Sequence, residues 1–318
     1  MERSPLASGE VSLRMYPHDL PAEACVEEMR RQSQLAEASG FDGVMTSEHH
    51  GGVRGYIPNP LQLASWLLDA TEHLWVAACP LLLPLRHWTH VAEEVAWLAC
   101  RFPGRVGAGF AAGGLAQDFE LADLPFEEAL ARFKRDLPRV VGALRGDVSP
   151  PLDGDPAIRR CAEAPVPLVS AAQSPAAARR AGRLGMAVLY DSLQTVERMA
   201  AVSAAHAAAG GSGARIAIRR VWIGGPPREE VNAQMDFYRG YAPAQAQAHW
   251  GDGEELVAGA TGEEVGQKLA EIARSGRCDA FNLRVHVHGV APGPVREQIE
   301  RLGGEAIPVL REALAGIA

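Results

Sequence analysis

A carboxylate and two imidazoles stand together at the end of a short apolar run, in the segment Glu48-His49-His50. The run before them, residues 43 to 46, has the length and composition of a buried strand, and two glycines follow. An imidazole at the end of a strand can act as an acid, a base or a hydrogen-bond donor near neutral pH. Neighbouring side chains of an extended chain point to opposite faces, so His49 and His50 are not expected to share a metal ion. A structural polar network is the alternative role for this pair.

A second polar set lies near the C-terminal end of the chain, at Asn282, Arg284, His286 and His288, alternating with apolar residues. Alternation places the four polar side chains on one face of a strand. The outer face of a barrel packs under helices and is apolar, so we expect this set to point inward, with His288 nearest the mouth. Three roles stay open: ligand contact, a His-x-His metal pair as in barrel hydrolases, or a polar interior with hydrogen-bonded imidazoles.

A third candidate is the segment Ser170 to Pro175, which follows a predicted strand and opens a helix. Ser174 suits the N-cap and Pro175 the first helical position. The free N–H groups of such a helix start can hold a phosphate. Helix capping alone explains these residues equally well.

The positions of these residues follow from a β/α repeat that continues along the whole chain. The predicted strands are 11–16, 43–46, 75–82, 105–110, 166–170, 186–190, 215–223 and 280–287, and helices of amphipathic or apolar composition lie between them. About eight such units in 318 residues indicate an α/β fold, a (β/α)8 TIM barrel with insertions at its C-terminal face. A doubly wound sheet is the alternative, but no Gly-x-Gly-x-x-Gly fingerprint follows the first strand. The segment Gly224–Gly262 is predicted to be a long irregular loop that acts as a lid.

The composition of the chain limits which kinds of partner it is expected to bind and in which compartment it is expected to lie. With 31 basic and 39 acidic residues, the formal net charge is −8, which offers no basic footprint for nucleic acid or an anionic membrane. Apolar runs are too short to span a bilayer, and the N-terminal residues do not resemble a signal peptide. Five scattered cysteines without a Cys-x-x-Cys spacing argue against a disulfide framework or a zinc site. We therefore expect a cytoplasmic protein.

Several segments together resemble the bacterial luciferase-like flavin-dependent monooxygenases, and the luciferase α subunit in particular. The resemblance rests on Phe41-Asp42-Gly43-Val44, Glu48-His49-His50, Asn59-Pro60, Ala70-Thr71-Glu72, Leu83-Pro84, Ala92-Glu93-Glu94, Gly104-Arg105, Asp118-Phe119, Gly262-Glu263-Glu264-Val265 and the closing Arg301 to Leu310 region. It spans nearly the whole chain and is weakest in the middle. A single barrel domain over residues 1–318 is the expectation.

The resemblance implies reduced FMN bound at the barrel mouth, with O2 adding at the flavin C4a position. A small organic substrate would then be oxygenated through a C4a-(hydro)peroxyflavin. The family's catalytic histidine corresponds to His49, and Glu48 would border the flavin. A family cis peptide beneath the flavin ring falls on Cys79-Pro80, where proline lowers the cost of the cis form.

Further cofactor contacts are implied at Ala111, Asp118, Ala172, Gln173 and Ser174. The family arginine that binds the FMN phosphate falls on Ala112, and a Glu-Ser pair of the family falls on Ala171-Ala172. A lost charge-assisted hydrogen bond removes about 1.5–3 kcal/mol of binding. The chain therefore also fits a deazaflavin-dependent hydride-transfer enzyme or a non-catalytic homologue.

The second substrate is expected to contact Tyr16, His50, Tyr190 and His288. A separate NAD(P)H:flavin reductase would supply reduced FMN, and the family implies a homodimer through the second and third helices. No bound metal is expected.

Overall fold

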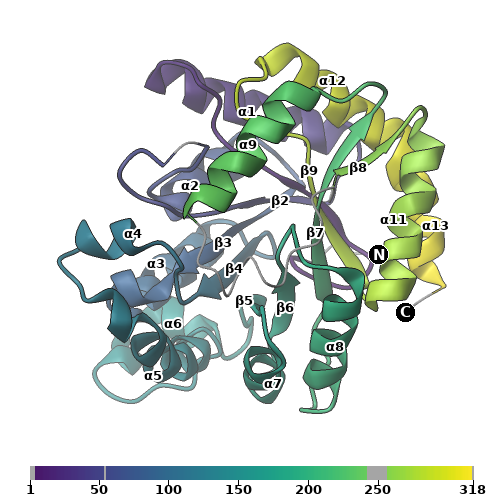
Figure 1. Ribbon diagram of the computed structural model, residues 1–318. Coiled ribbons are helices and arrows are strands. Elements are labelled where there is room, and N and C mark those ends of the chain that lie inside the picture. Colours follow the sequence, from purple (N-terminus) through teal and green to yellow (C-terminus); the bar gives the residue numbers. More distant parts are fainter. Residues whose placement is uncertain (1–3, 54, 242–255, 317–318) are drawn as a thin grey trace.

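The computed structural model describes residues 4–53, 55–241 and 256–316. Its parallel sheet closes into a barrel because β6 pairs with both β5 and β7, which confirms the predicted (β/α)8 architecture (Figure 1). The barrel strands are β1 (Val11–Arg14), β2 (Gly43–Thr46), β3 (Trp75–Leu82), β4 (Val106–Ala111), β5 (Leu168–Ala171), β6 (Ala187–Tyr190), β7 (Arg215–Ile223) and β9 (Ala280–Arg284).

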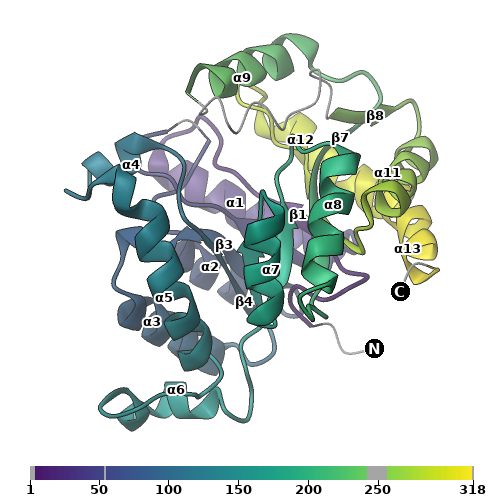
Figure 2. The ribbon, with the colours of Figure 1, turned by 60° about the horizontal axis from the view of Figure 1, so that its bottom comes forward.

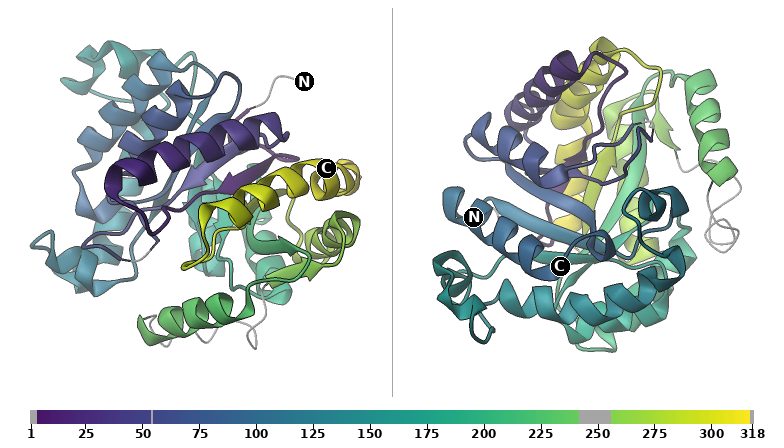
Figure 3. Two further views of the ribbon diagram at one scale, coloured as in Figure 1. Left: turned by 90° about the horizontal axis from the view of Figure 1, so that it is seen from above. Right: turned by 90° about the vertical axis from the view of Figure 1, so that its left-hand side faces the viewer.

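Helices surround the barrel, and α1, near the start of the chain, lies beside α12, near its end (Figure 3). The longer ones are α1 (Ala22–Ala38), α2 (Pro60–Asp69), α3 (Trp88–Arg101), α5 (Ala129–Ala143), α7 (Pro175–Arg183), α8 (Val196–Ala207), α11 (Gly262–Gly276), α12 (Pro292–Arg301) and α13 (Ile307–Ala315). Shorter helices are α4 (Ala116–Glu120) and α6 (Pro156–Arg160). Within the described ranges, no helix combines the length and apolar character needed to cross a membrane.

The predicted strand boundaries hold at β2, β3 and β7, while the first and last barrel strands are shorter than expected. The pairing of β9 with β7 ends at Arg284 opposite Arg220. The Arg284 Nε then donates to the His286 carbonyl at 3.0 Å, so the chain turns locally beyond this point. The sequence pattern predicts that alternation continues to His286 and His288. This prediction is wrong, because the strand ends at Arg284.

The closing helical region, α12 and α13, is interrupted by a π-helical turn at Leu302–Ala306. This turn brings Gly303 against α1, where a Cβ would collide with the Ser39 carbonyl. Close backbone approach thus explains a glycine in the middle of an otherwise regular helical region.

The segment Gly224–Gly262 is not wholly irregular, which corrects the predicted loop. It contains α9 (Arg228–Tyr241) and β8 (Leu256–Gly259), and β8 extends the sheet by pairing with the end of β7. The buried side chains of α9 include Val231, Met235 and Tyr238, spaced as one face of a helix. That spacing is visible in the sequence and could have revealed the helix. Residues 242–255 of the predicted lid lie outside the described residues.

The core has an inner and an outer layer, as parallel barrels require. Side chains such as Met45, Trp75 and Ile218 fill the barrel interior, and Leu6 joins them from the N-terminal segment. The outer layer packs the strands against the helices. At β2, Gly43 leaves room for the Trp75 ring, which a Cβ there would overlap.

Candidate active site

A cavity of about 450 Å³ opens at the C-terminal end of the barrel. This volume falls within the range of small-molecule and cofactor sites. Helix α9 lies at this end, outside the ring of barrel helices (Figure 2). The cavity is lined by Arg14, Ser47, Glu48, His49, Pro80, Leu82, residues 111–115, Leu130, Phe133, Ala171, Gln173, Ser174, Ala177, Arg180, residues 191–193, Arg220 and Tyr238.

The Glu48 carboxylate, just after β2, is hydrogen-bonded to the end of β3 and to the loop that follows it. One carboxylate oxygen accepts hydrogen bonds from the Leu82 N–H at 2.7 Å, and the other from Arg86 Nη2 at 2.9 Å. The side chain is fully buried, so these donors replace the water that a carboxylate needs. Glu48 therefore holds the cavity wall in place.

His49 is paired with a carboxylate distant in sequence. Its Nδ1 donates to Asp118 Oδ2 at 2.7 Å, and the backbone N–H of His50 donates to Asp118 Oδ1 at 2.7 Å. The Asp118 side chain has no exposed surface. The Tyr56 ring packs edge-on against His49, with centroids 4.4 Å apart. Because Asp118 occupies Nδ1, Nε2 is the nitrogen that can exchange a proton with a molecule in the cavity.

His50 does not line the cavity, and its side chain is paired with Glu48. Its Nε2 lies 3.0 Å from the carboxylate. This hydrogen bond raises the pKa of His50, and burial opposes the rise. The structure thus separates the two histidines as the alternation argument predicted, one toward the cavity and one into a polar network.

The Cys79-Pro80 peptide is cis, in agreement with the expectation. The pairing of β3 with β4 shifts register between Ala78 and Leu81, so the strand bulges at this point. Pro80 lines the cavity, whereas the Cys79 side chain is buried within the barrel. Burial raises the pKa of the Cys79 thiol to about 12, which keeps it protonated and unreactive.

Tyr16 lies behind the cavity wall between two guanidinium groups. Arg14 Nε donates to its hydroxyl at 3.0 Å, and the Arg284 guanidinium lies 3.9 Å from its ring centroid. Burial alone would raise the pKa of Tyr16, but Arg14 and Arg284 outweigh it and lower the pKa to about 7.

This shift predicts a phenol that ionises near neutral pH. The tyrosinate absorbance of the native protein should rise as pH passes about 7, and this step should be absent in Tyr16→Phe. The depressed pKa also means that ionised Tyr16 adds stability as pH rises from its folded toward its unfolded pKa. A spectrum unchanged by Tyr16→Phe in this pH range would contradict the assignment.

The β5–α7 junction is built as the sequence predicted. Ser174 caps α7 by accepting from the Ala177 N–H at 3.3 Å, and both Gln173 and Ser174 line the cavity. Ala111 lines it too, while Ala172 is buried outside the lining.

Sequence reasoning missed Arg180, which also lines the cavity from α7. Its guanidinium lies 5.3 Å from the Phe133 ring centroid, and its Nε has no hydrogen-bond partner in the part of the chain that the structure describes. Helical spacing provides a signal for it, since Arg180 lies three residues after Ala177, which also lines the cavity.

The remaining predicted substrate contacts do not line this cavity. Tyr190 is fully buried in the layer between sheet and helices, where burial raises its pKa. His288 is half-buried beyond β9. Burial lowers the pKa of His286, whose ring packs 4.6 Å from that of His18. The described residues contain no group of three His, Cys, Asp or Glu side chains placed to hold a metal ion, so the metal-hydrolase alternative lacks a third ligand there.

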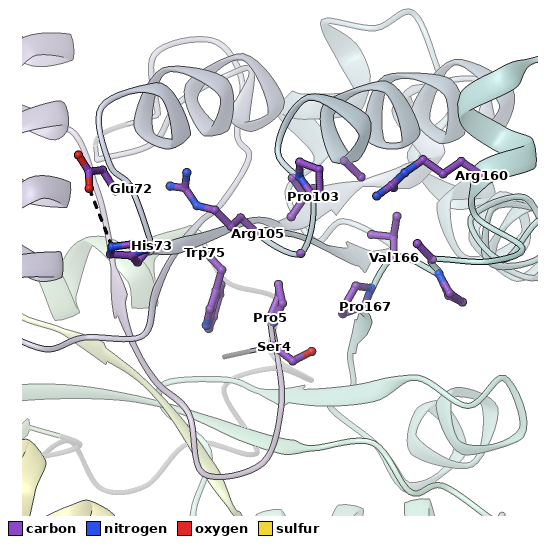
Figure 4. Close-up of a pocket in the computed structure, with 15 residues that line it drawn as sticks. Ser4, Pro5, Glu72, His73, Trp75, Pro103, Arg105, Arg160, Val166 and Pro167 are labelled. Atoms are coloured by element: carbon purple, nitrogen blue, oxygen red, sulfur yellow. Dashed lines mark ion pairs between the residues drawn. The ribbon is translucent and has the colours of Figure 1, made fainter. Parts of the chain in front are cut away.

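A second cavity, of about 640 Å³, lies at the opposite end of the barrel, where β3 and β4 begin. Figure 4 shows Arg105 and Arg160 on its two sides and Ser4 and Pro5 near Trp75. Arg105 donates to the Leu74 carbonyl and to Thr71 Oγ1, at 3.0 and 2.8 Å. These contacts tie loops together, as expected of the stabilising face of such barrels.

Comparison with known proteins gives consistent matches. A family model described as luciferase-like monooxygenase matches residues 12–303. An F420-dependent glucose-6-phosphate dehydrogenase from Beutenbergia cavernae is 35% identical over 166 residues, 48% of this chain and 48% of that protein. An alkanal monooxygenase alpha chain from Photorhabdus luminescens is 30% identical over 125 residues, 39% of this chain and 35% of that protein. The chain thus spans about half or less of the length of these curated relatives.

Solved structures with the same fold match nearly the full length of this chain. The crystal structure of monooxygenase RslO1 from Streptomyces bottropensis has a TM-score of 0.78 at 19% identity, covering 94% of this chain and 99% of that one. At this identity the likeness concerns the fold alone.

Proposed function

Because this chain belongs to the luciferase-like monooxygenase family, we propose that it is an oxidoreductase that uses reduced FMN and O2 to oxygenate a small organic substrate. The observation that carries the proposal is the His49–Asp118 pair, which lies at the wall of a cofactor-sized cavity. Reduced flavin, when bound, would supply the electrons that activate O2.

The residues around the cavity fit a phosphate-bearing flavin. Ser174 and the start of α7 offer hydrogen-bond donors, and Arg180 offers a cation whose Nε lacks a partner among the described residues. Arg180 thereby replaces the charge that is missing at Ala112. Pro80 and Leu82 supply apolar surface at the β3 bulge, where a flat ring system can pack.

His49 is the residue that we propose to move protons in this site. Asp118 holds its ring in one orientation and favours the tautomer with the proton on Nδ1. Nε2 is then free to accept or return a proton at the reacting atoms. Tyr238 of α9 lines the cavity and helps to exclude water from it.

The test is an anaerobic titration with reduced FMN, followed by mixing with O2 and recording of spectra. Arg180→Met should weaken cofactor binding about 10- to 100-fold, the value of one charge-assisted hydrogen bond. Arg179→Met is the matched control, because Arg179 is an exposed neighbour on α7 outside the cavity lining. Equal effects of the two substitutions would contradict the placement of the phosphate beside Arg180.

A deazaflavin-dependent hydride transfer is the second candidate, favoured by the 35% identity to an F420-dependent dehydrogenase. The same titration with the reduced deazaflavin separates the two. Binding of deazaflavin without O2 consumption would replace the monooxygenase proposal. Binding of neither cofactor would favour a non-catalytic homologue.

A separate reductase as the source of reduced flavin, a cytoplasmic location and a homodimer stay predictions. Trp66 on α2 and Trp97 on α3 are 36% and 54% exposed, which supports a subunit contact on this face. Sedimentation analysis of the protein would test the dimer.

A further inference from the structure

Three arginines are buried together at the barrel mouth without a carboxylate partner. Arg14, Arg220 and Arg284 are 5%, 3% and 3% exposed. Within the described part of the chain, none of them lies within ion-pair distance of an Asp or Glu. Buried charges are usually paired, because an uncompensated one loses its hydration without replacement.

Two of the three guanidinium groups, those of Arg14 and Arg284, donate hydrogen bonds to uncharged acceptors. Arg14 Nη1 donates to the Cys79 carbonyl and to Asn282 Oδ1, each at 3.2 Å. Arg284 donates to the Tyr238 hydroxyl at 2.9 Å and to a backbone carbonyl. Both also face Tyr16, whose ionisation compensates part of their charge.

Arg220 is different, because most of its donors have nothing to bind. Its Nη1 contacts the Met235 sulfur, but among residues 4–53, 55–241 and 256–316 Nε and Nη2 have no hydrogen-bond partner. Its guanidinium lies 5.3 Å from the Tyr238 ring centroid, and the residue lines the cavity. Burial and the neighbouring Arg284 lower its pKa.

The location of Arg220 separates it from the proposed cofactor phosphate. Arg180 and Ser174 follow β5, whereas Arg220 lies on β7 beneath α9, with β6 between the two strands. A flavin anchored beside α7 would leave the Arg220 end of the cavity for the second substrate.

We propose that this end binds the anionic oxygen group of the organic substrate, with Arg220 as the residue that selects for it. Nε and Nη2 together form the planar fork that recognises carboxylate or phosphate oxygens. A neutral substrate would leave the buried guanidinium unpaired, which is the basis of selection. The inference rests on the proposed function for the assignment of the two ends, but anion binding can be measured without any cofactor.

Calorimetric titration of the protein with benzoate, phenyl phosphate and benzyl alcohol tests the proposal. At least one of the two anions should bind about tenfold or more tightly than the alcohol. The anion that binds more tightly shows whether the site prefers a carboxylate or a phosphate. Arg220→Met should abolish this preference, and Arg180→Met should retain it. Two results would overturn the proposal. One is a preference for the anion that is lost in Arg180→Met but kept in Arg220→Met, and the other is equal affinity of the native protein for all three compounds.

Thermal unfolding provides a second readout, part of which needs no added probe. Removal of an unpaired buried charge should leave Tm of Arg220→Met equal to or above that of the native protein, and the preferred anion should raise Tm of the native protein alone. A lower Tm in Arg220→Met and a further fall in Arg220→Lys would instead show a structural role. Anion binding without reduced-flavin binding would refute the proposed function and leave this inference standing.

Discussion

His49→Ala is expected to slow the oxidation of bound reduced flavin by O2 about 10²- to 10⁴-fold, the usual contribution of a positioned acid–base group. The substitution removes the imidazole at the cavity wall and leaves the Ser174 and Arg180 end intact. Cofactor affinity should therefore change little. Stopped-flow spectra of reduced flavin mixed with O2 measure this rate without knowledge of the organic substrate.

Asp118→Asn provides the matched test of how His49 is oriented. Both oxygens of Asp118 accept hydrogen bonds, one from His49 Nδ1 and one from the His50 N–H. An amide has one oxygen, so one of these donors must face an NH2 group. The rate should fall and its pH profile should shift, whereas His73→Ala, at an exposed histidine, should change neither. An unchanged rate in His49→Ala would remove His49 from the mechanism.

Glu48→Ala is expected to lower the free energy of unfolding by about 2–4 kcal/mol. It leaves the buried Leu82 N–H without an acceptor and Arg86 without its buried partner; each unmade buried hydrogen bond costs about 1–3 kcal/mol. Urea denaturation measures the loss. Glu94→Ala is the control, because Glu94 pairs with the same arginine but is 53% exposed; exposed pairs contribute only about 0–1 kcal/mol.

The conservative variant Glu48→Gln adds a pH dependence with a defined sign. Glu48 raises the pKa of His50 in the folded state, so this pairing stabilises the protein below the unfolded pKa of histidine. That stabilisation is lost as pH rises through the folded pKa. The destabilisation by Glu48→Gln should therefore be greater in mild acid than above neutral pH, and NMR titration should show a lowered pKa for His50. Equal destabilisation at both pH values would refute the pairing.

Local patterns in the sequence determined the barrel and one half of the site. Apolar runs at regular intervals predicted the strands, because a parallel strand must be apolar on both faces. The end of the run at Thr46 placed Glu48 and His49 at the mouth, and Ser174-Pro175 marked a helix start. These features depend only on residues close together in the chain.

The tertiary structure alone decided which groups meet. Asp118 is 69 residues from His49, and no local pattern connects them. A sequence cannot reveal that Arg14 and Arg284 are hydrogen-bonded to neutral groups. Nor can it reveal that Arg220, on the strand beside β9, keeps two nitrogens without a partner among the described residues. Charge balance in a buried site depends on the distances between strands that closure of the barrel brings together. Those distances, rather than the identity of any single residue, determine what the cavity can bind.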